Sequence, residues 1–149
     1  MRRLFIIRKD LHLSPGKLAA MVGHCAEAYW IHLLKQGSID HFHLVNQKGE
    51  QIAYMTAAVS EDILEEYING AFTKTVCEAK NLNKLRKAEE IAKELGLKEY
   101  SDYGYINDNC LTELTPENED GTTTVGIWFK PLDDEVAHMI SKKFHLYMG

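Results

Sequence analysis

The stretch "LFIIRKDLHLSPGKLAAMVGH", residues 4–24, decides the fold because it places a short apolar strand directly before a long helix. Its first four residues are typical of a buried β-strand, which we predict over residues 3–9. Ser14 is a preferred N-cap residue and Pro15 a preferred first helical residue, so the helix begins there. Apolar residues then recur every three or four positions until Gly37, which ends the helix.

Strand and helix patterns alternate along the rest of the chain. Strand patterns fall at residues 73–80, 103–107 and 122–130, and helical periodicity falls near residues 60–70, 85–95 and 133–143. Residues 42–45 and 51–55 flank a glycine-containing turn and predict a β-hairpin. Strands that alternate with helices predict an α/β fold, a layered sandwich around a mostly parallel sheet.

The composition predicts one soluble globular domain. The 149 residues suffice for a single domain with its own core, and 45% of them are apolar and 26% charged. No apolar run is long enough to span a bilayer, so we expect no membrane partner. The three cysteines are widely spaced and odd in number, which argues against a disulfide framework and favours a reducing, cytoplasmic location.

Charge is distributed unevenly in the sequence. The net charge of -5 does not indicate a nucleic-acid-binding protein. However, residues 1–17 carry five Lys or Arg against Asp10 alone, and residues 113–135 carry seven acidic residues against Lys130 alone. A local basic patch can bind phosphate if the acidic segment lies elsewhere. The alternative, that both segments are solvated surface, stays open.

Two polar segments follow predicted strands, at residues 10–17 and 108–112. Ligands of α/β sheets bind at the carboxyl ends of strands, so both segments are candidate sites. In the first, free N–H groups of a helix start, a glycine and the charge of Lys17 together predict an anion site. In the second, Asp108 and Thr112 could orient a water or hydroxyl, or the segment is a plain turn.

The pair Gly16-Lys17 lies at a strand-to-helix junction, as in a P-loop. Leu11 and Leu18 stand where that motif needs glycine and Ser or Thr, so we exclude a nucleotide triphosphatase. His24 lies seven residues after Lys17, on the same helix face and about 10 Å further along the axis. This spacing suits an extended polar ligand; a hydrogen-bonded core histidine is the open alternative.

Other reactive residues give weaker indications. Cys110 as a nucleophile needs a neighbouring base, which the sequence does not identify. His41 and His43 match no strong zinc spacing and are interpreted as loop or strand histidines. We therefore predict no metal site and no cofactor.

Several motifs together resemble one known family. Residues 8–11 (Arg-Lys-Asp-Leu), residues 16–20 (Gly-Lys-Leu-Ala-Ala) and His24 resemble the N-terminal signature of the type 2 (archaeal and eukaryotic-type) peptidyl-tRNA hydrolases. Residues 108–114 (Asp-Asn-Cys-Leu-Thr-Glu-Leu) are similar to the second signature. The resemblance covers residues 4–36 and 73–147. It implies a four-stranded mixed sheet flanked by helices, one domain over residues 1–149, an insertion at 37–60 and a homodimer.

The resemblance also implies an activity, hydrolysis of the ester that joins a peptide to tRNA, without a metal. Lys17, Asp108 and Thr112 fall on catalytic positions of the family. The positions that the resemblance assigns to substrate binding are Arg8, Asp10, Gly16, His24 and Glu113. The partner implied is peptidyl-tRNA, and Arg2, Arg3 and Arg8 are candidate phosphate contacts if they are exposed.

The chain departs from the family pattern at the candidate site. It has Asn109-Cys110 where the family usually has Ala-Gly, and Met21 where the family usually has Gln. These departures leave two alternatives open. The chain could be a non-catalytic member that binds a nucleotide-like or protein ligand, or an interaction module that uses residues 37–60.

Overall fold

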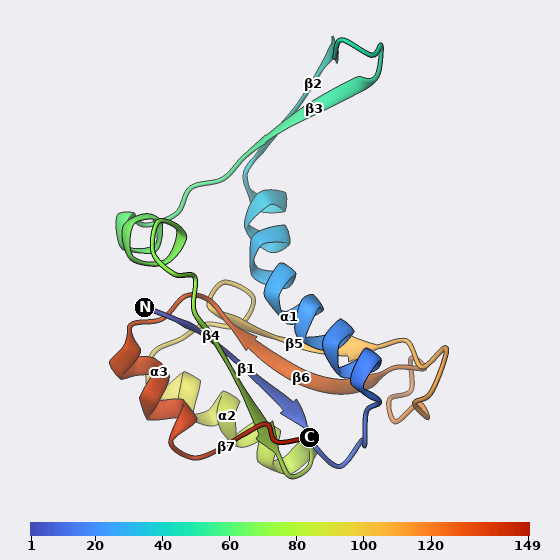
Figure 1. Ribbon diagram of the computed structural model, residues 1–149, viewed down its shortest axis with the longest axis vertical. Helices are drawn as coiled ribbons and strands as arrows, with labels where there is room; N and C mark the ends of the chain where they lie inside the picture. Colours follow the sequence, from blue (N-terminus) through green and yellow to red (C-terminus); the bar gives the residue numbers. More distant parts are fainter.

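The computed structural model describes the backbone of residues 1–149 and every side chain except those of residues 40–44. Its main sheet has five strands in the order β5-β6-β1-β4-β7 (Figure 1). These strands are β1 (Arg3–Arg8), β4 (Lys74–Ala79), β5 (Tyr103–Asp108), β6 (Thr123–Phe129) and β7 (His145–Leu146). The helices are α1 (Pro15–Gln36), α2 (Leu82–Glu94), α3 (Asp134–Ser141) and the π-helical turn η1 (Ile63–Ile68).

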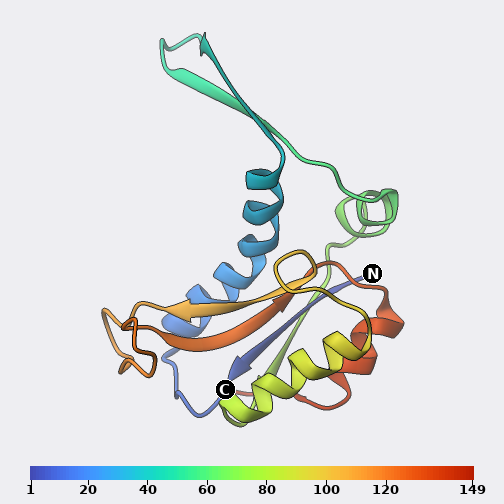
Figure 2. The same ribbon diagram turned by 180° about the vertical axis from the view of Figure 1, so that it is seen from behind.

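Successive residues of β1 point to opposite faces of the sheet and enter two separate cores. Leu4 and Ile6 pack with the buried residues of α2 and α3. Phe5 and Ile7 pack with the buried residues of α1 and with Ile63 of η1. Figures 1 and 2 show the same arrangement, with α1 and α2 on opposite faces of the sheet. The predicted three-layer α/β sandwich is therefore confirmed.

The sheet differs from the expected one in the number and direction of its strands. It has five strands rather than four. Only β1 and β4 pair in parallel, and the other three pairings are antiparallel, so the expectation of a mostly parallel sheet was wrong. Residues 109–122 join β5 to β6 without a helix, and strands joined without a crossover helix pair antiparallel. The two residues of β7 are too few to leave a periodic pattern in the sequence.

Helix α1 begins and ends where the sequence predicts. The Ser14 hydroxyl accepts a hydrogen bond from the backbone N–H of Lys17 at 3.3 Å, and Gly37 is the C-terminal cap. The buried residues of α1 are Met21, Cys25 and Tyr29. Among the helices that the structure describes, none has both the length and the apolar character to cross a bilayer.

The predicted hairpin is formed by β2 (Ser38–Val45) and β3 (Gln51–Thr56). It is a separate two-stranded sheet that projects from the main body beyond the end of α1 (Figure 1). A Cβ atom added at Gly37 would lie 1.7 Å from the carbonyl oxygen of Thr56. The close approach of the two ends of the hairpin therefore requires glycine at position 37. Among the hairpin side chains that the structure describes, the large apolar ones that are exposed are Ile39, Val45, Tyr54 and Met55.

Candidate active site

The three residues at predicted catalytic positions come together at one edge of the sheet. Strands β1 and β5 run in the same direction because each pairs antiparallel with β6, so their carboxyl ends share this edge. The Lys17 ammonium lies 2.6 Å from a carboxylate oxygen of Asp108, the last residue of β5. The same ammonium donates to the Thr112 hydroxyl at 3.4 Å. The Lys17 and Asp108 side chains are 15% and 8% exposed, and Thr112 is exposed.

The start of α1 is held against the segment that follows β5. The Glu113 carboxylate accepts hydrogen bonds from the backbone N–H of Ser14 at 3.0 Å and from its hydroxyl at 2.6 Å. These two bonds lower the pKa of Glu113. A lysine in the first turn of a helix is unfavourable with the helix dipole, and the carboxylates of Asp108 and Glu113 offset that repulsion. The anion that Lys17 meets is thus part of the chain itself.

Asp108 is held in its ionised form. Burial of the carboxyl favours the neutral acid, but hydrogen bonds from the Lys17 ammonium and the Cys110 backbone N–H outweigh it. The second bond is 2.9 Å long. The charge of His24 acts in the same direction, and the resulting pKa of Asp108 lies below its ordinary value of 3.8. Lys17 and Asp108 therefore form an ion pair at neutral pH.

Cys110 shapes the turn that carries Asp108. Its backbone φ of 60° lies in the left-handed region, where only glycine is free of steric cost. The family to which the sequence bears resemblance usually has glycine here, and the positive φ gives the physical reason. The Cys110 thiol lies 3.4 Å from the Thr123 hydroxyl and 3.5 Å from the Asp108 carbonyl. The thiol thus packs within the turn.

The Arg8 side chain is buried and connects three segments of the chain, so it is not an exposed phosphate contact. Its side chain is 4% exposed and pairs with the carboxylates of Asp10 at 2.9 Å and Glu117 at 2.5 Å. It also donates to the carbonyl of Thr124 at 2.9 Å. Burial of the guanidinium opposes its charge, but the two carboxylates raise the pKa of Arg8 above its ordinary value. Asp10 is therefore engaged within the chain, and the pair with Glu117 connects the segment after β5 to β1.

Arg3 also fails the condition of exposure. Its guanidinium is fully buried and donates to the carbonyls of Phe129 at 3.0 Å, Cys25 at 2.9 Å and Ala26 at 2.5 Å. Burial lowers the pKa of Arg3 to about 10. Arg3 and Arg8 therefore do not meet the condition of exposure under which they were candidate phosphate contacts, because internal hydrogen bonds engage both guanidinium groups.

The remaining predicted site residues lie along α1. His24 is exposed, and Met21, which lies between Lys17 and His24 in the sequence, is 3% exposed and packs in the core. The polar face that the spacing predicts is therefore interrupted. At Gly16 an added Cβ atom would meet no protein atom within 4 Å, so the chain itself does not require glycine there. This leaves open space beside the helix start.

Among the side chains that the structure describes, no three His, Cys, Asp or Glu residues gather in a way that could hold a metal ion. The side chains of His41 and His43 lie outside the described set. The three cysteines are free. Two contacts at the site, those of Ser14 with Glu113 and of Arg8 with Glu117, were missed from sequence because each joins segments far apart in the chain.

Comparison with known proteins agrees with this arrangement. A curated peptidyl-tRNA hydrolase of Methanopyrus kandleri is 28% identical over 123 residues, which cover 83% of this chain and 78% of the relative. The family model described as "Peptidyl-tRNA hydrolase PTH2" matches residues 1–147. Because that match spans nearly the whole chain, the protein belongs to the PTH2 family of peptidyl-tRNA hydrolases.

Proposed function

We propose that this protein hydrolyses the ester bond between a peptide, or an N-acylated amino acid, and tRNA. Membership of the PTH2 family supports the reaction class. The observation that carries the proposal is that Lys17, Asp108 and Thr112, which come from two distant segments of the chain, lie together. Lys17 forms an ion pair with Asp108 and donates a hydrogen bond to the Thr112 hydroxyl. For this function we expect a cytoplasmic protein whose cysteines are reduced, and the three free cysteines are compatible with that expectation.

Lys17 is assigned the role of electrophilic stabiliser. When water attacks the ester carbonyl carbon, negative charge develops on the carbonyl oxygen. An ammonium held by Asp108 and Thr112 is already oriented and stabilises that charge without rearrangement. Collapse of the tetrahedral intermediate then breaks the bond to the ribose oxygen. This oxygen leaves as a hydroxyl with a proton that comes from the attacking water, and the acyl group is released as a carboxylic acid.

Asp108 is assigned to water positioning rather than to strong base catalysis. A general base works best when its pKa is near the operating pH, and the pKa of Asp108 lies below 3.8. Its carboxylate is ionised and can accept a hydrogen bond from the attacking water. Thr112 accepts from Lys17, so its own hydroxyl hydrogen is available to a water or to the substrate.

The test is release of N-acetyl-aminoacyl groups from tRNA at low salt and without added metal, by wild type, Lys17→Ala and Asp108→Asn. We expect rates at least about 10²-fold lower in both variants, the cost of removing one preorganised donor or positioning group. Lys93→Ala is the matched control, because the Lys93 side chain is 63% exposed on α2 and pairs with Glu89 across one helical turn. It should hydrolyse at the wild-type rate.

Thermal unfolding of each variant shows whether a lost rate reflects a lost fold. Hydrolysis that disappears in folded Lys17→Ala and Asp108→Asn establishes the proposed reaction. A folded wild type without activity, beside an active control hydrolase, contradicts it and leaves the non-catalytic binding role.

A further inference from the structure

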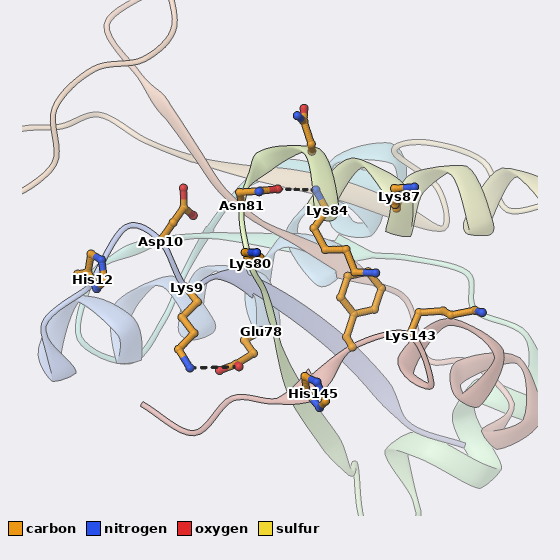
Figure 3. A pocket seen from close by; sticks show the side chains of 12 residues that line it. Lys9, Asp10, His12, Glu78, Lys80, Asn81, Lys84, Lys87, Lys143 and His145 are labelled. Carbon is orange, nitrogen blue, oxygen red and sulfur yellow. Dashed lines mark hydrogen bonds and ion pairs between the residues drawn. The ribbon is translucent and has the colours of Figure 1, made fainter.

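A second feature lies at the same edge of the sheet as the Lys17–Asp108 pair. It is an open groove of about 870 Å³ between the loop after β1, the start of α2 and the segment after α3 (Figure 3). Five lysines line it: Lys9, Lys80, Lys84, Lys87 and Lys143. Only two carboxylates, Asp10 and Glu78, face them. The lining of this groove is basic although the chain as a whole has a net charge of -5, and a local cluster of cations attracts an anionic partner.

The cations are spread along the groove rather than gathered at one point. Figure 3 shows Lys9 and His12 at one end, Lys80 and Asn81 in the middle, and Lys84, Lys87 and Lys143 at the other end. A single small anion is best held by donors that converge on it. A row of separated lysines instead matches a chain of phosphates, each neutralised by one ammonium.

Two contacts position groups in the groove. The Lys84 ammonium lies 5.3 Å from the centre of the Phe144 ring, which holds this side chain across the groove. The Asn81 side chain accepts a hydrogen bond from the Lys84 backbone N–H at 2.9 Å and caps α2. The positive end of the α2 dipole therefore adds to the lysine charges. Lys9 is partly neutralised by Glu78, at 3.3 Å.

The groove and the candidate active site are connected by one loop. Lys9, Asp10 and His12 line the groove, and the same loop continues to Ser14, which is bonded to Glu113. Strand β4 is parallel to β1, so its carboxyl end, which leads into Lys80, lies at the edge that also holds Asp108. A polyanion bound in the groove therefore lies at the same edge of the sheet as Lys17 and Asp108.

We propose that this lysine groove binds the sugar-phosphate backbone of the RNA whose acylated 3′ end lies at Lys17 and Asp108. The inference rests on the proposed function for the identity of the RNA, but binding in the groove does not require hydrolysis. Contacts to the backbone alone make binding dependent on salt and independent of RNA sequence.

The test compares two double variants with the same change of charge. Lys80→Gln/Lys87→Gln removes two groove cations, and Lys93→Gln/Lys98→Gln removes two exposed lysines that do not line the groove. Binding of deacylated tRNA is measured at several salt concentrations. We expect the slope of log Kd against log salt to fall by about 2 in the groove variant and to stay unchanged in the control. Equal slopes in wild type and groove variant overturn the proposal.

Two substrates separate this inference from the proposed function. The groove variant should lose kcat/KM for N-acetyl-aminoacyl-tRNA but keep it for N-acetyl-aminoacyl-adenosine, which is too short to reach the groove. Lys17→Ala should lose both. If wild type hydrolyses neither substrate while the groove variant still loses its salt-dependent tRNA binding, the function fails and the groove assignment stands. Displacement of tRNA by inorganic phosphate at constant ionic strength indicates a small-anion site and overturns the RNA assignment.

Discussion

The ion pair between Lys17 and Asp108 yields a quantitative prediction. Replacing Lys17 by Met and Asp108 by Asn, singly and together, measures the coupling free energy between the two side chains. The ammonium and carboxylate lie 2.6 Å apart with 15% and 8% of their side chains exposed. A charge-assisted hydrogen bond contributes roughly 1.5–3 kcal/mol, and an exposed ion pair roughly 0.2–1 kcal/mol. From its burial and distance we expect a coupling of about 2 kcal/mol for this pair.

Urea unfolding at pH 7 is the assay. With a slope of about 2 kcal/mol/M, a loss of about 2 kcal/mol lowers the unfolding midpoint by about 1 M. The matched control is the same cycle on Glu89 and Lys93, which lie 3.8 Å apart with 63% of the lysine side chain exposed. That pair should couple by about 0.3–0.5 kcal/mol. A Lys17–Asp108 coupling no larger than the control value would refute the reasoning, because the two groups would then be solvated separately.

The coupling free energy between Lys17 and Asp108 should depend on pH. The folded-state pKa of Asp108 is lowered below 3.8, so the unfolded chain takes up the proton first as the pH falls. The stabilisation is therefore fully present above the ordinary pKa and is lost as the pH falls through the folded-state pKa. We expect equal coupling at about pH 7 and pH 5.5 and a smaller coupling near pH 3. A coupling that already declines between the two higher values would place the pKa of Asp108 above its ordinary range.

Three further predictions concern the surroundings of the site. Glu113→Ala removes both hydrogen bonds to Ser14 at the start of α1. It should lower the rate of ester hydrolysis by up to about 10²-fold, because the helix start no longer holds Lys17 at its position beside Asp108. Cys110→Gly relieves a left-handed backbone that costs a non-glycine residue roughly 1 kcal/mol, so its Tm should equal or exceed that of wild type, whereas Cys110→Val should unfold at a lower temperature. Joining Gly37 to Ala57 through Gly-Ser in place of residues 38–56 should change Tm by less than about 3 °C, and sedimentation of this variant tests whether the hairpin mediates a homodimer.

Local chemistry explains which elements could be predicted from the sequence. The start of α1 is set by Ser14 and Pro15, whose preferences act within one turn of helix. The two cores follow from the continuous apolar run of β1, because a strand covered on both faces has no polar alternation. Lys17 and Asp108 were placed at strand ends by the same local patterns, and strand direction brought them together.

Long-range pairing explains what could not be predicted. Nothing in the sequence shows that Arg8 pairs with Glu117, 109 residues away, so the burial of its side chain could not be predicted. Met21 lies between Lys17 and His24 in the sequence, but its side chain is buried in the core that also contains Val125 and Trp128 of β6. The periodicity of a strand predicts which of its residues face a core, but it does not predict which strands lie beside it. The antiparallel pairing of β6 with both β1 and β5 therefore could not be predicted from the sequence.

The distribution of charge bears on whether an acidic chain can bind RNA at this site. The acidic segment that follows β5 lies against the start of α1, where repulsion of phosphate would be most damaging. Three of its carboxylates are engaged within the chain, since Glu113 accepts from Ser14, Glu117 pairs with Arg8 and Asp120 accepts from the Thr122 hydroxyl. Five lysines line the groove, which the loop after β1 borders. Negative net charge then opposes nonspecific contact over the rest of the surface, while the groove keeps a local attraction that salt can screen. This separation predicts that tRNA binding is steeply salt-dependent even though the protein as a whole is an anion.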